Sequence, residues 1–269
     1  MSEKTLYFIA GFPRAGSTLL CNILNQNPRF HATSTSGILE IVIAIRNQWE
    51  NVTAFAASPN KQGKTNVMRG ILNSYHEDIE RPIVFDKSRG WIGKIPLAEH
   101  LLKAKIKILV PVRSIVDILA SFEKLYRSNS HDWEFPQEKT NYFDWQTMEG
   151  RADLLMKNDQ SVGLAYNMIR EALDRGFEDR MHLIEFEDLT HDPKGTMFKI
   201  YQFLGEKYFK HNFNKVVQVT HENDDIHGIP GLHIIRSKVE PVIVNAVELI
   251  GTAAFNKYFD AQFWRKKDE

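Results

Sequence analysis

The sequence predicts an α/β fold of one domain, in which a parallel sheet is flanked by helices on both faces. Short apolar runs alternate with segments of helical periodicity, and this alternation is typical of parallel sheets, because each crossover helix returns the chain across one face. The chain has 269 residues, of which 43% are hydrophobic and 25% charged, as in ordinary globular proteins. We therefore expect a single domain over residues 1–269.

Each element can be placed from the pattern. Strands are predicted at Leu6–Ala10, Pro82–Phe85, Ile106–Val112 and His182–Phe186. Helices are predicted from about Gly16 to Asn27, over Ser36–Trp49, after the capping Ser114, from Asp192 to Gly205 and over residues 241–259. Ligands of such sheets bind beyond the carboxyl ends of the strands. The segments that follow the four strands are GFPRAGST, DKS, RS and EDL, which are polar and capable of chemistry.

Composition and charge restrict the partners and the compartment. The 34 basic and 34 acidic residues cancel, whereas proteins that bind nucleic acid by bulk charge are usually strongly basic. No apolar stretch has the length of a membrane span, and Leu6–Ala10 is too short for the core of a signal peptide. Cys21 is the single cysteine, so an intrachain disulfide cannot form. We expect a cytoplasmic protein with neither a nucleic-acid nor a membrane partner.

The loop Gly11–Thr18 has the strand, loop and helix context of a phosphate cradle. Its glycines are spaced as in a P-loop, which makes the predicted sheet P-loop-like, but Ser17 stands where the P-loop lysine is expected. Glycines allow the backbone to approach an anion, and a helix N-terminus offers free N–H groups. Arg14 supplies a cation from within the loop. The alternative is an ordinary tight turn with capping hydroxyls.

The missing lysine bears on the kind of ligand. Enzymes of nucleoside triphosphates hold a highly charged phosphate chain with that lysine and Mg²⁺. A sulfuryl group carries less charge than a terminal phosphoryl group and depends less on a metal. The loop therefore favours a phosphosulfate donor over a nucleoside triphosphate.

A second anion site is predicted at the end of the third strand. Arg113 ends that strand, and Ser121 lies seven residues beyond Ser114, two helical turns along nearly the same face. An arginine fork and a serine hydroxyl can bind one phosphate together. Without a ligand, the same residues would be a strand-end arginine, an N-cap and an exposed serine.

These segments resemble the PAPS-dependent sulfotransferases, where PAPS is 3′-phosphoadenosine 5′-phosphosulfate. GFPRAGSTLL resembles the family's 5′-phosphosulfate loop, VPVRSIVDILASF its 3′-phosphate motif, and LIEFEDLTHDP a later strand-and-turn signature. AIRNQW at Ala44–Trp49 and IRSKVE at Ile235–Glu240 are similar to segments of the tyrosylprotein sulfotransferase branch. The resemblance extends from about residue 6 to residue 240.

The resemblance implies metal-free, in-line transfer of a sulfuryl group from PAPS to an acceptor hydroxyl or amine, leaving adenosine 3′,5′-bisphosphate. It implies that Lys87 stabilises the transferring group and that Arg14 holds the 5′-phosphate. The remaining donor-binding residues that it implies are Ala15, Gly16, Ser17, Thr18, Arg113, Ser121, Ser237 and Lys238. An ammonium just after a strand can also neutralise charge that develops on the bridging oxygen.

The general base is not supplied by the resemblance. The tyrosylprotein branch carries a glutamate shortly after the first helix, but the stretch Thr33–Gly37 has no carboxylate. His31 lies near that position and Glu40 on the following helix, so these two are the candidates for catalysis beside Lys87. The other candidates are His76 with Glu77, and the histidines His221, His227 and His233. The six-residue spacing of that trio matches no short zinc motif and no cysteine accompanies it, so no metal is expected.

Two segments are candidates for contact with the acceptor, a small molecule or a peptide. Residues 127–150 contain several aromatic residues and are either an acceptor-side insertion or an irregular hydrophobic cluster. Residues 220–240 are a possible flap over the donor. Two other functions stay open: a P-loop kinase or nucleotide hydrolase, and a nucleotide-binding protein without catalysis. The sequence leaves the oligomeric state open.

Overall fold

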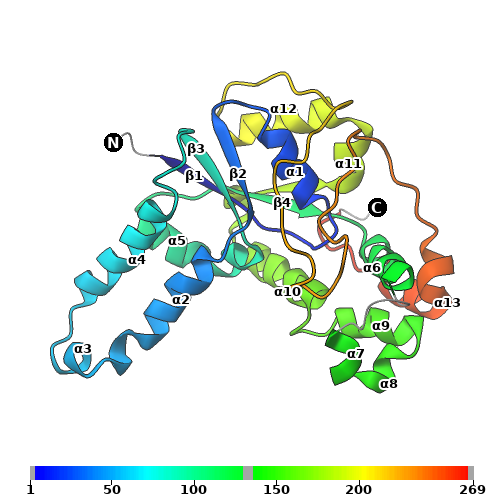
Figure 1. The fold of residues 1–269 in the computed structure, drawn as a ribbon, viewed down its shortest axis with the longest axis horizontal. Helices are drawn as coiled ribbons and strands as arrows, with labels where there is room; N and C mark the ends of the chain where they lie inside the picture. Colours follow the sequence, from blue (N-terminus) through cyan, green and yellow to red (C-terminus); the bar gives the residue numbers. More distant parts are fainter. Residues whose placement is uncertain (1–3, 130–135, 266–269) are drawn as a thin grey trace.

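The computed structural model describes residues 4–129 and 136–265. In these ranges five strands form one parallel sheet in the order β2-β3-β1-β4-β5. The strands are β1 (Thr5–Ile9), β2 (Phe30–Thr35), β3 (Ile83–Lys87), β4 (Ile108–Val112) and β5 (Met181–Glu185). The prediction of a P-loop-like parallel sheet with helices on both faces is confirmed (Figure 1).

The helices connect the strands and extend the fold beyond the sheet. They are α1 (Ser17–Leu24), α2 (Ile38–Gln48), α3 (Thr53–Ala57), α4 (Lys61–Tyr75), α5 (Ile95–Leu102), α6 (Ile115–Asn129), α7 (Pro136–Thr140), α8 (Tyr142–Trp145), α9 (Met148–Leu155), α10 (Ser161–Asp174), α11 (Phe186–His191), α12 (Pro193–Leu204) and α13 (Ala246–Tyr258). Short 3₁₀ helices cover Trp49–Asn51, Arg89–Lys94 and Glu178–Arg180. None of the helices in the described ranges is both long enough and apolar enough to cross a membrane.

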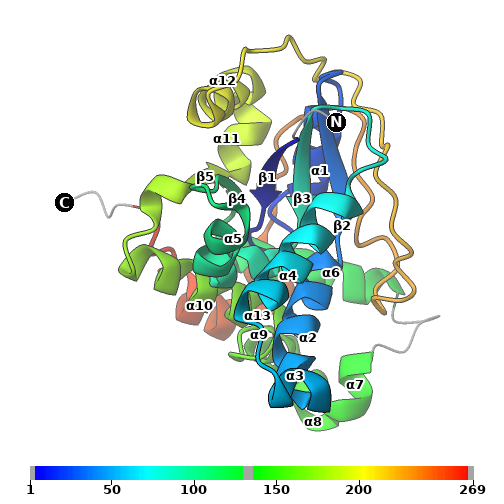
Figure 2. The ribbon, with the colours of Figure 1, turned by 90° about the vertical axis from the view of Figure 1, so that its left-hand side faces the viewer.

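Each face of the sheet buries its own core, because alternate side chains of a strand point to opposite faces. On β1, Phe8 belongs to the core beneath α2, α4, α5 and α10, whereas Tyr7 and Ile9 belong to the core beneath α1, α11 and α12. Figures 1 and 2 show the two layers, with α2 and α4 projecting together away from the sheet. Helices thus cover the central strands on both faces, and the edge formed by the carboxyl ends of the strands stays open to the loops.

A long segment without helix or strand, residues 206–245, joins α12 to α13; we call it the late loop. It passes over α1 (gold to orange in Figure 1). The Asn22 side chain on α1 anchors it: Oδ1 accepts hydrogen bonds from Val219 N at 2.6 Å and Thr220 N at 3.1 Å, and Nδ2 donates to Thr220 Oγ1 at 2.8 Å. This anchoring brings the following residues to the carboxyl ends of the strands.

Candidate functional site

A cavity of about 840 Å³ opens at the carboxyl ends of the central strands. Its walls come from the loop after β1, the end of β3, the middle and C-terminal part of α6, the late loop and the start of α13. Of the residues predicted to bind the donor or to act in catalysis, the following line it: Arg14, Gly16, Ser17, Thr18, Lys87, Arg113, Ser121 and Lys238. Ala15 is buried beneath the loop, and the Ser237 carbonyl accepts a hydrogen bond from Val216 N at 2.6 Å. The topology therefore gathers residues from distant parts of the chain around one space.

The loop between β1 and α1 is shaped by two glycines. A Cβ on Gly11 would lie 2.2 Å from the Pro111 carbonyl oxygen, so only glycine allows the loop to pass this close to β4. Gly16 has a φ of +83°, in the left-handed region, and its Cα packs against Phe186, 2.7 Å from where a Cβ would stand. With this turn the chain enters α1 at Ser17, and the first N–H groups of the helix face the cavity side of the loop.

Two arginines and a serine form a cationic cluster beside the loop. Arg14 Nε donates to Ser121 Oγ at 3.1 Å, and Arg113 Nη1 donates to the Arg14 carbonyl at 3.2 Å. The Arg113 guanidinium lies over the Phe186 ring, 4.5 Å from its centroid. Phe186 thus fixes both the Gly16 turn and the Arg113 side chain. The predicted first and second anion sites are neighbours, and Arg14 reaches the second one.

The cluster carries positive charge that carboxylates offset only without direct contact: Asp224 attracts Arg14, and Asp117 and Glu187 attract Arg113. Among the described residues, neither Arg14 nor Arg113 forms an ion pair, and Arg113 Nε is buried without a hydrogen-bond partner. Burial, followed by repulsion from Arg113, lowers the pKa of Arg14 to about 10, and burial also lowers the pKa of Arg113. A buried cation without a partner is costly, so the cluster is suited to an anionic ligand.

Lys87 ends β3, which lies beside β1, and its side chain is buried with only 9% exposed. Its Nζ lies 2.8 Å from Glu222 Oε1 of the late loop. The same oxygen accepts hydrogen bonds from Thr35 N at 3.0 Å and Thr35 Oγ1 at 2.9 Å. Burial alone would raise the pKa of Glu222, but the hydrogen bond and charge of Lys87 and the Thr35 donors outweigh it and lower that pKa to about 2.

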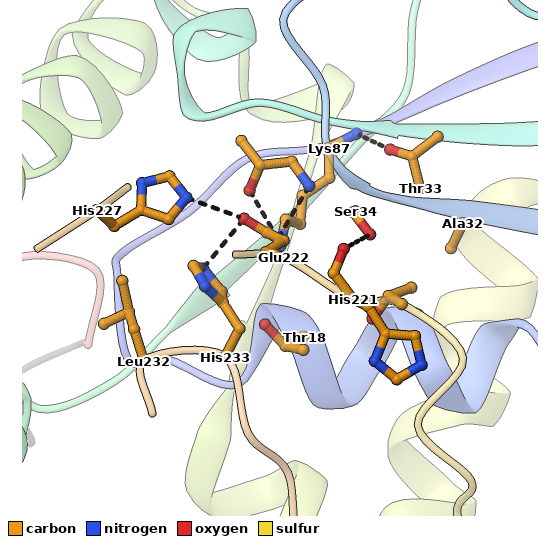
Figure 3. Close-up of polar contacts among 12 residues, drawn as sticks. Thr18, Ala32, Thr33, Ser34, Lys87, His221, Glu222, His227, Leu232 and His233 are labelled. Atoms are coloured by element: carbon orange, nitrogen blue, oxygen red, sulfur yellow. Dashed lines mark hydrogen bonds and ion pairs between the residues drawn. The ribbon is translucent and has the colours of Figure 1, made fainter. Parts of the chain in front are cut away.

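The second oxygen of Glu222 faces two histidines (Figure 3). Glu222 Oε2 lies 3.4 Å from His227 Nε2 and 3.5 Å from His233 Nε2. His233 Nδ1 lies 2.6 Å from Asp224 Oδ1, which fixes the ring with its proton on Nδ1 and leaves Nε2 as an acceptor. Burial lowers the pKa of His233 and outweighs the hydrogen bond that its Nδ1 donates to Asp224, which raises that pKa. His227 and His233 both line the cavity.

The other candidates for the general base lie elsewhere. His31 lies near the start of β2, paired with Val84, so it is far from the carboxyl ends where the cavity opens. Its pKa is lowered by burial and by Arg81. Glu40 is exposed on α2 and lines a separate hollow beside α10. Neither residue lines the cavity, so the structure does not bring these two candidates together with the other predicted site residues.

The remaining polar candidates also have other surroundings. His76 is buried and its Nε2 lies 3.1 Å from Asp86 Oδ2, while Trp91 Nε1 donates to Asp86 Oδ1 at 2.7 Å. These three side chains form a structural network within the core on the α4 side of the sheet. Glu77 is exposed. The His221 ring points away from Glu222 (Figure 3), and the His221 carbonyl accepts from Ser34 Oγ at 3.0 Å.

Residues 127–150 were expected to be an acceptor-side insertion or an irregular hydrophobic cluster. Trp133 and Phe135 lie outside the described residues. Trp145 is buried in a small cluster with Leu154, Tyr126 and Ile229, whereas Tyr142 and Phe143 are exposed. The contact with Ile229 joins this region to the late loop at the cavity wall. Whether it contacts the acceptor stays a prediction.

The comparisons with known proteins identify the family and the fold. A family model described as "Sulfotransferase family" matches residues 7–210. No curated protein matched the sequence. Among solved structures, mouse sulfotransferase SULT7A1 complexed with PAP superposes with a TM-score of 0.56 at 13% identity, covering 100% of this chain and 86% of that chain. The sulfotransferase domain of the Synechococcus PCC 7002 olefin synthase has a TM-score of 0.52 at 19% identity, covering 94% and 96% of the two chains.

The two structures confirm the fold, and the family match supports the assignment that the motifs predicted. The match is to the family as a whole, so the similarity to the tyrosylprotein branch stays a prediction. The family model spans the strand and loop regions that carry Arg14, Lys87, Arg113 and Ser121. By this match over most of its length, the chain belongs to the sulfotransferase family and is an enzyme of that class.

Proposed function

We propose that this enzyme moves a sulfuryl group from PAPS to an acceptor hydroxyl or amine by metal-free, in-line transfer. The observation that carries the proposal is the pair of buried Arg113 and half-buried Arg14, neither of which forms an ion pair among the described residues, with Arg113 Nε buried and without a hydrogen-bond partner. Such a pair fits a ligand with a phosphate at that end. The mouse relative was crystallised with PAP, which supports the same donor here.

The donor would be held at two ends. Arg113, Ser121 and Arg14 would bind the 3′-phosphate, because the Arg14 side chain lies against Ser121. This differs from the sequence-based expectation, which assigned Arg14 to the 5′-phosphate. The N–H groups and hydroxyls of Gly16, Ser17 and Thr18 would bind the 5′-phosphosulfate at the start of α1. Ala15 contributes its backbone to this loop.

The late loop would close the donor site from above. Lys238 lines the cavity. The resemblance implies that Lys238 and the adjacent Ser237 bind the donor. Residues 220–240 run along one side of the cavity and would form the flap over the donor. The domain would then be a single sulfotransferase unit over residues 1–269, with residues 127–150 on the acceptor side.

Lys87 would neutralise the charge that develops on the bridging oxygen as the sulfuryl group leaves. In the structure its ammonium pairs with the carboxylate of Glu222, which lies at the end of β3 where the phosphosulfate would bind. Binding of the donor would exchange this carboxylate for the phosphosulfate. The carboxylate thus keeps the buried lysine paired until the donor arrives.

His233 is the best-placed general base. It lines the cavity, its Nε2 can accept a proton beside Glu222 Oε2, which lies 3.5 Å away, and Asp224 fixes its ring. Its lowered pKa keeps it neutral near pH 7. Glu222, with a pKa of about 2 and one oxygen bound to Lys87, is a much weaker proton acceptor. We therefore assign His233 as the base and Asp224 as its positioning residue.

The kinase or hydrolase alternative requires a cation where Ser17 stands, and no observation in the described residues favours it.

Thermal unfolding with ligands separates the two candidate functions. Adenosine 3′,5′-bisphosphate at a hundred times its dissociation constant would stabilise the protein by about 2.7 kcal/mol, a rise in Tm of about 5–10 °C for this size. ATP with Mg²⁺ should shift Tm far less, and the reverse order would refute the proposal.

Two variants sharpen this test. Arg113→Ala should weaken bisphosphate binding by about 2–4 kcal/mol, because it removes a desolvated fork to phosphate. Arg170→Ala is the matched control, since this arginine is exposed on α10 and does not line the cavity. Transfer of label from radiolabelled PAPS to a panel of alcohols, phenols and amines would then separate an enzyme from a binding protein, because only an enzyme labels an acceptor.

A further inference from the structure

The late loop brings together a set of groups that has the composition of a transition-metal site. Glu222, His227 and His233 each offer one ligand atom, and these three atoms lie within 4.8 Å of one another. Two imidazoles and one carboxylate are a common set of protein ligands for Zn²⁺. The sequence did not point to this set, because the spacing of the histidines matches no short motif and the third ligand is Glu222.

The spacing of the atoms fits one small cation. A tetrahedral Zn²⁺ with bonds of about 2.0–2.1 Å separates its ligand atoms by about 3.4 Å. The measured separations from Glu222 Oε2 are 3.4 Å to His227 Nε2 and 3.5 Å to His233 Nε2. All three atoms lie within 4.8 Å of one another, so a shift of one imidazole toward the other would let a single ion bind the carboxylate and both imidazoles.

The surroundings of the cluster support this assignment independently. Asp224 Oδ1 lies 2.6 Å from His233 Nδ1, which is the outer-shell contact that orients metal-bound histidines and leaves Nε2 for the ion. Lys87 holds Glu222 Oε1, so Oε2 alone is left for a ligand bond. With neutral imidazoles, two carboxylates and one ammonium leave one net negative charge, which suits a dication. Because His227 and His233 line the cavity, further coordination positions are open to it.

We propose that Glu222, His227 and His233 form an inhibitory binding site for a divalent ion of the Zn²⁺ class. The inhibition rests on the proposed function, in which His233 Nε2 accepts the proton of the acceptor. A bound ion occupies that same lone pair, so metal and proton compete for one atom. Binding therefore stops transfer, and a chelator restores it.

Binding is tested without reference to activity. Chelator-treated protein is titrated with Co²⁺, whose visible absorption reports a four- or five-coordinate site, and with Zn²⁺ in a calorimeter. We expect one saturable site per chain. His227→Ala should weaken it at least about tenfold, as even loss of an outer-shell partner costs 10–100-fold. His221→Ala is the matched control, because its ring points away from Glu222 (Figure 3).

The effect on transfer is measured with the same variants. His227 has no role in the proposed reaction, so His227→Ala should keep its turnover with PAPS in chelated buffer and lose inhibition by Zn²⁺. Absence of saturable binding, unchanged affinity in His227→Ala or equal loss in His221→Ala would each overturn the site. Binding of adenosine 3′,5′-bisphosphate in chelated buffer is recorded separately, so failure of the proposed function is distinguished from failure of the metal site.

Discussion

Replacement of Glu222 by glutamine tests the buried contact that links the late loop to β3. The side chains of Lys87 and Glu222 are only 9% and 8% exposed, and their charged atoms lie 2.8 Å apart. A carboxyl pKa of about 2 in place of 4.5 corresponds to about 3 kcal/mol. Solvent around the open cavity screens part of this interaction energy. We therefore expect Glu222→Gln to lower the free energy of unfolding by about 2 kcal/mol at pH 7.

The contribution of Glu222 to the free energy of unfolding should fall at low pH. A carboxyl whose pKa is lower in the folded state binds fewer protons there than in the unfolded state, so its contribution is complete above pH 4.5. The contribution then declines as the pH falls toward the folded value of about 2. The difference in unfolding free energy between wild type and Glu222→Gln should therefore be constant above pH 5 and shrink steadily below 4.5.

Urea denaturation followed by tryptophan fluorescence, at several pH values from 7 to 3, measures this difference. Other carboxyl groups titrate equally in both proteins and cancel in the comparison. Glu240→Gln is the matched control, because Glu240 pairs with Lys238 at 3.0 Å on the surface, with side chains 43% and 60% exposed, and should change little. A loss in Glu222→Gln that does not vary with pH, or none at pH 7, would refute the buried pair.

Further predictions concern catalysis and the phosphate loop. Lys87→Ala should lower kcat much more than it changes KM for PAPS, in steady-state assays with any acceptor found; unchanged kcat would remove its assigned role. The kcat of the wild type should rise with pH and level off, with its acidic limb below pH 6.5, because burial lowers the pKa of His233. Asp224→Asn should move this limb to lower pH, because the Asp224 carboxylate raises that pKa. Gly11→Ala should cost about 2 kcal/mol or more in urea unfolding, since its Cβ would lie 2.2 Å from the Pro111 oxygen, whereas Gly37→Ala, with nothing within 4 Å, should be nearly neutral.

The inner strands could be predicted because burial on both faces leaves a continuous apolar run. Leu6–Ala10 and Ile106–Val112 were placed within two residues of β1 and β4. β2 (Phe30–Thr35) was missed, because it is an edge strand in which only Phe30 and Ala32 are buried and the other residues are polar. Its sequence, FHATST, contains too few apolar residues to show the alternation of a strand. The error also misplaced His31, which lies at the start of this strand.

The form of the loop Gly11–Thr18 could be predicted because it is local. The residues that shape it, from Gly11 to Thr18, are contiguous, and a strand and a helix must flank them for the turn to form. Arg113 and Ser121 are likewise set by one strand and one helix. Their distance from Arg14 was not predictable, because it depends on how β1 and β4 pair; the structure places Arg14 Nε 3.1 Å from Ser121 Oγ.

The contact of Lys87 with Glu222, and the choice of His233 among the candidate histidines, could not be predicted, for the opposite reason. Lys87 and Glu222 are 135 residues apart, and Glu222 belongs to a loop whose path is set by hydrogen bonds to Asn22 on α1 rather than by its own periodicity. The family model ends at residue 210, so the groups around Glu222 and His233 lie beyond the matched residues. The matched part carries the loop Gly11–Thr18, Lys87 and the arginine cluster. The family match therefore bears on the residues proposed to bind the donor, whereas the proposed base, His233, depends on the path of the late loop alone.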